Sequence, residues 1–195
     1  MVLKALAGKI DQAEDVIQLA THSWLAALYD PGDTLRNCPW EDEFQKLSQA
    51  LQFQTDDADE LRRDLEEQVL SEMTIISPRQ AVRFWFLIGT FHADHQLYHD
   101  AFEAFFLCER HMCATDKAAY IIVCTALADT ARQVSLPATA NLYYSLVLTM
   151  LSADDWEEVA PWTREARATL ADHILRRRSQ LDLHATDRVC GISAP

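Results

Sequence analysis

Histidine and acidic side chains cluster in one short part of the sequence, between residues 92 and 111. The cluster includes His92, Asp94, His95, His99, Asp100, Glu109 and His111. Imidazole nitrogens and carboxylate oxygens are common ligands of transition metals in proteins. On an uninterrupted helix His95 and His99 would share a face, because they lie four residues apart, and a nearby side chain could add a third ligand. A helical bundle that binds a metal through His92, His95 and His99 is therefore one hypothesis for this chain.

Two features of the sequence argue against a metal centre. Metal sites in helical bundles draw carboxylates from several helices in a Glu-x-x-His pattern, and this sequence lacks that pattern. If the chain turns between His92 and His99, the turn separates the histidines, and the cluster is an ordinary polar connection. We therefore expect no metal and no cofactor.

The other reactive side chains follow no known catalytic pattern. The five cysteines are Cys38, Cys108, Cys113, Cys124 and Cys190. The five-residue step from Cys108 to Cys113 fits neither a redox pair nor a zinc knuckle. There is no glycine-rich phosphate loop and no Gly-x-Ser-x-Gly motif. We predict that the protein is not an enzyme. The odd number of cysteines and the lack of a recognisable signal peptide favour the reducing cytoplasm.

Composition narrows the fold and the partners. Of the 195 residues 49% are hydrophobic and 24% charged, which is enough apolar material for a packed core. Only four glycines and six prolines occur, too few for the turns of a many-stranded sheet, so helix is expected throughout. The formal charge of −13 repels phosphate backbones and anionic lipids, which makes nucleic acid and membrane surfaces poor partners. No stretch is apolar for long enough to span a bilayer.

The first part of the chain reads as one long amphipathic helix over residues 3–28. Its apolar stripe consists of Leu3, Leu6, Ile10, Ala13, Ile17, Ala20, Trp24 and Ala27. Steps of four and three residues place these side chains in a heptad seam. Such a seam packs either on the core of the same chain or against a second copy, which would make a homodimer through residues 3–28. Pro31 and Gly32 end the helix.

Capping residues and apolar spacing define the remaining elements. A short helix carrying Phe44 is expected first, followed by one that starts near Thr55. The later helices are expected to run from Pro78 to Phe91 or Ala93, from Tyr98 to Met112, from Thr115 or Asp116 to Arg132, from Pro137 to Leu151, and from near Asp154, with a restart at Pro161, to residues 176–178. The chain thus divides into an N-terminal helix (1–30), a helical packing segment (31–76), a repeat region (77–183) and a flexible tail (184–195).

The helices between residues 78 and 151 form two consecutive pairs with a tetratricopeptide-like pattern. In the first pair the pattern comprises Trp85, Ile88, Gly89, Tyr98, Ala101, Phe105 and Cys108. In the second pair it comprises Tyr120, Val123, Cys124, Leu127, Ala140, Tyr144 and Val147, with five residues more than the usual unit of roughly 34. Small residues let paired helices approach, so Gly89 should pack against Ala101 or Phe105. The expected fold is all-α, a tetratricopeptide-like array of helical hairpins behind the N-terminal amphipathic helix; a generic helical bundle is the alternative.

Residues 96–108 resemble the first-to-second repeat segment of the chaperones of type III secretion translocators, which are small acidic bacterial proteins. The likeness extends over residues 78–175, and the helix at 3–28 would correspond to the family's N-terminal amphipathic helix. The sequence departs from the family at two glycines, replaced by Gln96 or His95 and by Cys124. Residues 30–76 have no counterpart.

The resemblance implies a cytoplasmic chaperone that holds an extended segment of a secreted protein in a concave groove. The groove positions would be Arg83, Phe86, Thr90, Ala93, Ala118, Ile121, Thr125 and Ala128. A mixture of small and apolar side chains suits an extended peptide. For Phe86 and Ile121 a place in the ordinary core is an equal alternative. A general protein–protein adaptor is the other function that this pattern fits.

Overall fold

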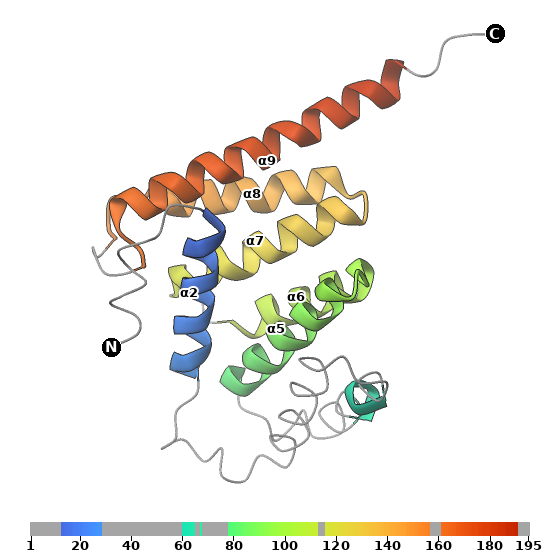
Figure 1. Cartoon of the computed structure of the whole chain (residues 1–195), viewed down its shortest axis with the longest axis vertical. Helices are drawn as coiled ribbons and strands as arrows, with labels where there is room; N and C mark the ends of the chain where they lie inside the picture. The colour runs from blue at the N-terminus through green and yellow to red at the C-terminus, as the bar shows by residue number, and fades with distance from the viewer. Residues whose placement is uncertain are drawn as a thin grey trace, which may run out of the picture. The chain divides into compact units, whose positions relative to one another are not determined.

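The computed structural model describes the chain over residues 13–28, 60–64, 67, 78–112, 116–156 and 161–190. Every regular element in these ranges is an α-helix, and consecutive helices pack in pairs (Figure 1). This confirms the predicted all-α array of helical hairpins. The chain divides into two compact units, one made of residues 1–24 with 113–195 and the other of residues 25–112. No described helix is both long and apolar enough to cross a membrane.

The unit of residues 25–112 contains the hairpin of α5 (Pro78–Asp94) and α6 (Tyr98–His111). Proline suits the first position of a helix because it has no N–H to leave unpaired, and α5 begins at Pro78 as predicted. A Cβ atom on Gly89 would lie 2.6 Å from the ring of Phe105, so only glycine allows this approach of the two helices. The Cys108 thiol of α6 donates to the Val82 carbonyl of α5 at 3.4 Å, a further contact between the two helices.

The other unit contains α7 (Lys117–Gln133), α8 (Pro137–Leu151) and α9 (Arg164–Cys190), with α8 between α7 and α9 (Figure 1). The Asp116 carboxylate accepts a hydrogen bond from the Ala119 N–H at 3.0 Å and caps α7, as predicted. The limits of α8 also agree with the prediction. Because α7 is buried almost all round, it forms the core of this unit.

The two hairpins turn in the same way. Gln96 and Ser135 both have φ of 61°, and each follows the end of the first helix of its hairpin. The next N–H groups, those of Leu97 and Leu136, each donate 2.8 Å to the carbonyl five residues back. This is the Schellman motif, which satisfies the last carbonyls of a helix. The turn recurs after 39 residues, as do the first residues of both helices. The 39-residue interval is five residues longer than the usual unit of roughly 34, but the excess does not arise inside the second pair as predicted, because both hairpins have the same spacing between the starts of their helices.

The N-terminal helix is described as α2 (Ala13–Leu28), and residues 3–12 of the predicted helix lie outside the described ranges. Its buried residues are Ala13, Val16, Leu19, Ala20 and Trp24. Ile17, predicted to lie in the seam, is only partly buried. Val16 and Leu19, which lie outside the predicted seam, are buried instead. The buried face is wider than a strict heptad seam, as is usual for a helix packed on a globular core.

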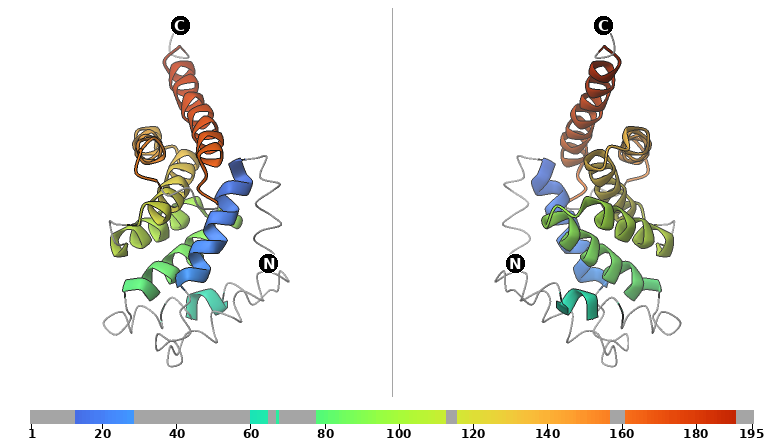
Figure 2. Two further views of the ribbon diagram at one scale, coloured as in Figure 1. Left: turned by 90° about the vertical axis from the view of Figure 1, so that its left-hand side faces the viewer. Right: turned by 90° about the vertical axis from the view of Figure 1, so that its right-hand side faces the viewer.

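Two predicted boundaries of the last helix are wrong. Residues 153–156 are not helical, and α9 begins at Arg164, where the Thr163 hydroxyl accepts from the Ala166 N–H at 3.2 Å. The helix does not end at residues 176–178 but continues through Cys190, so residues 184–190 of the predicted tail are helical. No glycine or proline interrupts the sequence from 164 to 190, and the helix extends beyond α8 (Figure 2).

Two predicted segments lie mostly outside the described ranges. Of the segment 31–76 the structure describes only the helical residues 60–64 and residue 67, and of the tail it does not describe residues 191–195.

Candidate functional site

The predicted turn inside the histidine cluster is present. Helix α5 ends at Asp94, and the His95 ring lies in the turn, where its Nδ1 is 2.9 Å from the Phe91 carbonyl oxygen. His92 is buried beside the Phe91 ring, with the ring centroids 5.6 Å apart, whereas His99 is exposed on α6. In the part of the chain that the structure describes, no three histidine, cysteine or acidic side chains come together as metal ligands.

The eight residues predicted to line a peptide groove fall into two groups. Four are buried, namely Phe86, Ile121, Thr125 and Ala128. The other four are partly exposed, namely Arg83, Thr90, Ala93 and Ala118. The Phe86 ring packs against Phe105 with its centroid 5.4 Å away, which makes it a core residue of its hairpin. The Thr125 hydroxyl donates to the Ile121 carbonyl at 2.7 Å, so this polar side chain is also satisfied inside the fold.

The register of the two hairpins differs from the one used to choose these residues. The turns place Thr125 at the position of Phe86, and Asp129 at the position of Thr90. Ala128, not Cys124, corresponds to Gly89. The predicted alignment of α7 was therefore displaced by one helical turn. The small residue that the repeat pattern requires is present after all, because Ala128 is fully buried.

Asp129 is the centre of a polar network that sequence reasoning missed. Its carboxylate accepts a hydrogen bond of 2.5 Å from the Tyr144 hydroxyl and forms an ion pair with Arg177. Burial, and then the charge of Asp129, raises the pKa of Tyr144, so this hydroxyl keeps its proton and donates. Glu14 on α2 lies 3.5 Å from His173 and 3.9 Å from Arg177, both on α9. The network thus joins α2, α7, α8 and α9.

The carboxylate, hydroxyl and guanidinium of this network satisfy one another, and together they link the helices that carry them. In the sequence, Asp129 is marked only by its alignment with Thr90 of the first hairpin. That alignment requires knowing that the second hairpin turns at Ser135.

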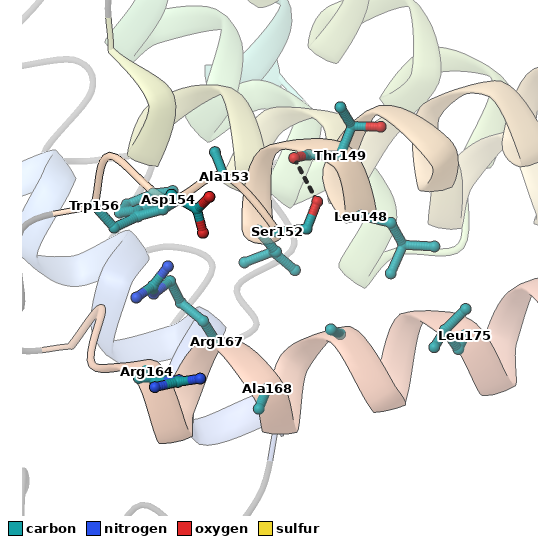
Figure 3. A pocket seen from close by; sticks show the side chains of 12 residues that line it. Leu148, Thr149, Ser152, Ala153, Asp154, Trp156, Arg164, Arg167, Ala168 and Leu175 are labelled. Atoms are coloured by element: carbon teal, nitrogen blue, oxygen red, sulfur yellow. Dashed lines mark hydrogen bonds between the residues drawn. The ribbon is translucent and has the colours of Figure 1, made fainter.

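An open space lies between the end of α8 and the first turns of α9. Its volume is about 940 Å³, and it is lined by both charged and apolar side chains (Figure 3). Arg164 and Arg167 lie toward one end, with Asp154 nearby, while Leu148 and Leu175 lie toward the other. We call this space the α8–α9 groove. It belongs entirely to the unit of residues 1–24 and 113–195.

Trp156 forms a rigid wall of the α8–α9 groove. Its Nε1 donates to the Met150 carbonyl at 2.8 Å, and its ring centroid is 5.3 Å from that of Trp162. The Arg167 guanidinium lies over the Trp156 ring, 5.4 Å from its centroid. A cation over an indole face is attracted by the ring's negative charge density. This contact holds the Arg167 guanidinium on the face of the Trp156 ring.

The lining of the α8–α9 groove combines exposed aliphatic surface, since Leu175 is 49% exposed, with charged side chains. The sequence did not reveal it, because its lining residues are spread over the end of one helix, a connection and the next helix. Comparison of the chain with protein-family models, with characterised proteins and with solved structures finds no significant match.

Proposed function

We propose that this protein binds another polypeptide and holds a segment of it in the α8–α9 groove. The observation that supports this proposal is the groove itself, an open space of about 940 Å³ with aliphatic side chains at one end and arginines at the other. A groove of this composition suits a peptide, whose backbone is polar and whose side chains alternate in character. The described residues offer no catalytic arrangement that would favour an enzyme instead.

The narrower proposal is a cytoplasmic chaperone for a secreted protein, similar to the chaperones of type III translocators. Its support is the repeated hairpin, with Gln96 in the left-handed conformation at the place where that family has a glycine. A general adaptor would use the same groove. For the metal-binding alternative, the turn at residues 95–97 separates the histidines of the cluster, so no observation favours it.

Site-specific photocrosslinking in cells that make the protein naturally would test the proposal. A photoreactive amino acid at Leu175 or Thr149, both lining the groove, should give an adduct with a defined polypeptide identified by mass spectrometry. The matched control is Gln180, which is exposed on the same helix but does not line the groove. An adduct from Thr90 and none from the groove would place the partner on the face first predicted. If neither surface gives a polypeptide adduct, the proposal is wrong.

A further inference from the structure

We infer that the outer face of α8 is a surface at which two copies of this protein pair, with their α8 helices antiparallel about a twofold axis. The outer face consists of Ala138, Leu142, Leu146 and Met150, which follow one another at intervals of four residues and so form one ridge of the helix. None of the four lines the α8–α9 groove. The inference therefore goes beyond the proposed function, because it concerns a different surface and a second copy of the same chain.

The composition of α8 indicates a further neighbour on this face. The helix carries no charged side chain, and the uncharged stretch around it runs over the 21 residues from Gln133 to Ala153. In a chain with 24% charged residues, a stretch of that length would carry about five of them. A helix that is apolar on every side is normally buried on every side. Helix α8 packs on α7 and on α9, yet Leu142 is 57% exposed and Leu146 43% exposed on its outer face.

A pocket beside the outer face gives an exposed leucine a place to insert. Its volume is about 260 Å³. Its lining comes from both helices of the hairpin, namely Lys117, Tyr120, Cys124, Leu146 and Met150. Lys117, the charged residue of this lining, is ion-paired with Asp155. Leu142 has the most exposed of the large hydrophobic side chains described, and it lies four residues from Leu146 on the same helix. The same face thus carries an exposed leucine and a pocket of a kind that can hold one.

The order of residues along α8 makes the outer face complementary to itself. Tyr144 is the middle residue of the helix, Leu142 and Leu146 lie two positions on either side of it, and Ala138 and Met150 lie six. When two such helices meet antiparallel at the level of Tyr144, Leu142 of each copy lies opposite Leu146 of the other, beside the pocket. Ala138 lies opposite Met150, so a small side chain meets a large one. The contact is isologous and closes at two subunits.

Charge favours a second copy over a foreign partner at this surface. The chain carries a formal charge of −13, so two copies repel each other at long range and meet at least cost where their surfaces are uncharged. A basic partner, which the net charge attracts, would gain most at an acidic face and least at this one. An uncharged, self-complementary face therefore suits the pairing of two like-charged copies.

Sedimentation equilibrium of the full-length protein, whose monomer mass is 22.2 kDa, tests the inference. One helix from each copy gives a contact at the small end of specific interfaces, so we expect a dimer with a dissociation constant of about 10 µM. L142E places a carboxylate without a partner in the pocket of the other copy and should weaken the dimer about tenfold or more. F106E is the matched control, because Phe106 is as exposed as Leu146 but lies on α6, and it should leave the dimer unchanged. Circular dichroism checks the fold of each variant.

Mixtures of variants test the antiparallel register. L142E and L146K should each be monomeric alone at about 50 µM, whereas an equimolar mixture should form a heterodimer. In the mixed pair the new glutamate faces the new lysine at one contact, and the other contact keeps its two leucines. L142E mixed with L142K is the control, since these two positions do not face each other, and it should stay monomeric. A heterodimer in the control mixture would overturn the antiparallel arrangement.

The remaining outcomes also decide the inference. A wild-type protein that stays monomeric at about 200 µM would overturn it, since a dimer that weak lies outside the expected range. A dimer that L142E and L146K leave intact would overturn it as well and would place self-association elsewhere, for example at residues 3–28. Binding to neutral phosphatidylcholine vesicles by a protein that is otherwise monomeric, lost in L142E, would assign the face to lipid and not to a second copy. Crosslinking from the α8–α9 groove decides the proposed function separately.

Discussion

Gly89 on α5 and Ala128 on α7 occupy the same place in their hairpins, and the residues that follow them differ in kind. The Thr90 hydroxyl donates to the Phe86 carbonyl of its own helix at 2.9 Å. Asp129 instead pairs with side chains of α8 and α9. In the first hairpin the two helices pack closely at Gly89. The second hairpin is instead linked to α9 by the ion pair between Asp129 and Arg177. One backbone frame can therefore be stabilised in two ways, according to what packs on it.

The largest expected effect comes from removing the carboxylate at the centre of the second hairpin. Asp129→Ala leaves the Arg177 charge and the Tyr144 hydroxyl without their shared partner in a partly buried position. Loss of one member of a buried pair costs about 3–5 kcal/mol, and the partial exposure of this pair reduces the figure to about 2 kcal/mol. Urea denaturation followed by circular dichroism measures the change in the free energy of unfolding.

Thr90→Ala, at the equivalent position of the first hairpin, is the matched control. Its hydroxyl bonds only within its own helix, and alanine is the better helix former, so the expected change is below about 0.5 kcal/mol. If both variants lose the same stability, the proposed difference between the hairpins does not exist.

The next effect tests the close approach in the first hairpin. In Gly89→Ala the new methyl group would lie 2.6 Å from ring carbons of Phe105, which is buried and cannot easily move aside. Overpacking costs about 1–3 kcal/mol, and the higher helix propensity of alanine returns about 1 kcal/mol. The net loss should be about 1 kcal/mol, measured by thermal unfolding.

The double variant Gly89→Ala with Phe105→Leu identifies the cause. A smaller side chain at 105 makes room for the methyl group, so the cost of Gly89→Ala should disappear in that background. Ala128→Gly, at the matching position of the second hairpin, should cost about 1 kcal/mol through helix propensity. A stabilising effect of Gly89→Ala in the native background would contradict the close-approach interpretation.

Local chemistry made much of the fold predictable from the sequence. Pro78, Asp116 and Pro137 mark helix starts by mechanisms that do not depend on the rest of the chain. The packing of Gly89 on Phe105 was predictable because both the small residue and the aromatic were in the repeat pattern.

The register of α7 was not predictable in the same way. Nearly every residue from Ala119 to Ala131 is buried, so the sequence has no polar face from which to read the orientation of the helix. The Asp129–Arg177 pair joins residues 48 positions apart, and nothing in the intervening sequence signals it. The end of α9 is mispredicted for a related reason: three consecutive basic residues at 176–178 are typical of a helix C-terminus. In the structure Arg177 instead forms an ion pair with Asp129 on α7, and Arg178 donates to the Asn141 side chain on α8 at 2.6 Å.

The smallest expected effect is a pH dependence of stability that comes from His173, which contacts Glu14 across α9 and α2. Burial, and then the charge of Arg177, lowers the pKa of His173 below its ordinary value of 6.5, while the charges of Glu14 and Asp129 partly oppose the shift and Arg176 adds to it. In the unfolded chain the imidazole takes up a proton as the pH falls through about 6.5. In the folded protein it does so only at lower pH. The unfolded state then binds more protons, so the free energy of unfolding should fall as the pH drops below about 6.5.

His173→Gln should remove this part of the pH dependence and leave the part that comes from carboxylates. Glu14→Gln removes a charge that raises the pKa of His173, so it should lower that pKa further. Proton NMR titration of the histidine ring in the folded protein measures the pKa, and urea denaturation at pH 7 and pH 5.5 measures the stability. A pKa of His173 above 6.5 would mean that its ion pair with Glu14 outweighs burial. In that case protonation of His173 would strengthen its ion pair with Glu14, and the free energy of unfolding would rise in mild acid.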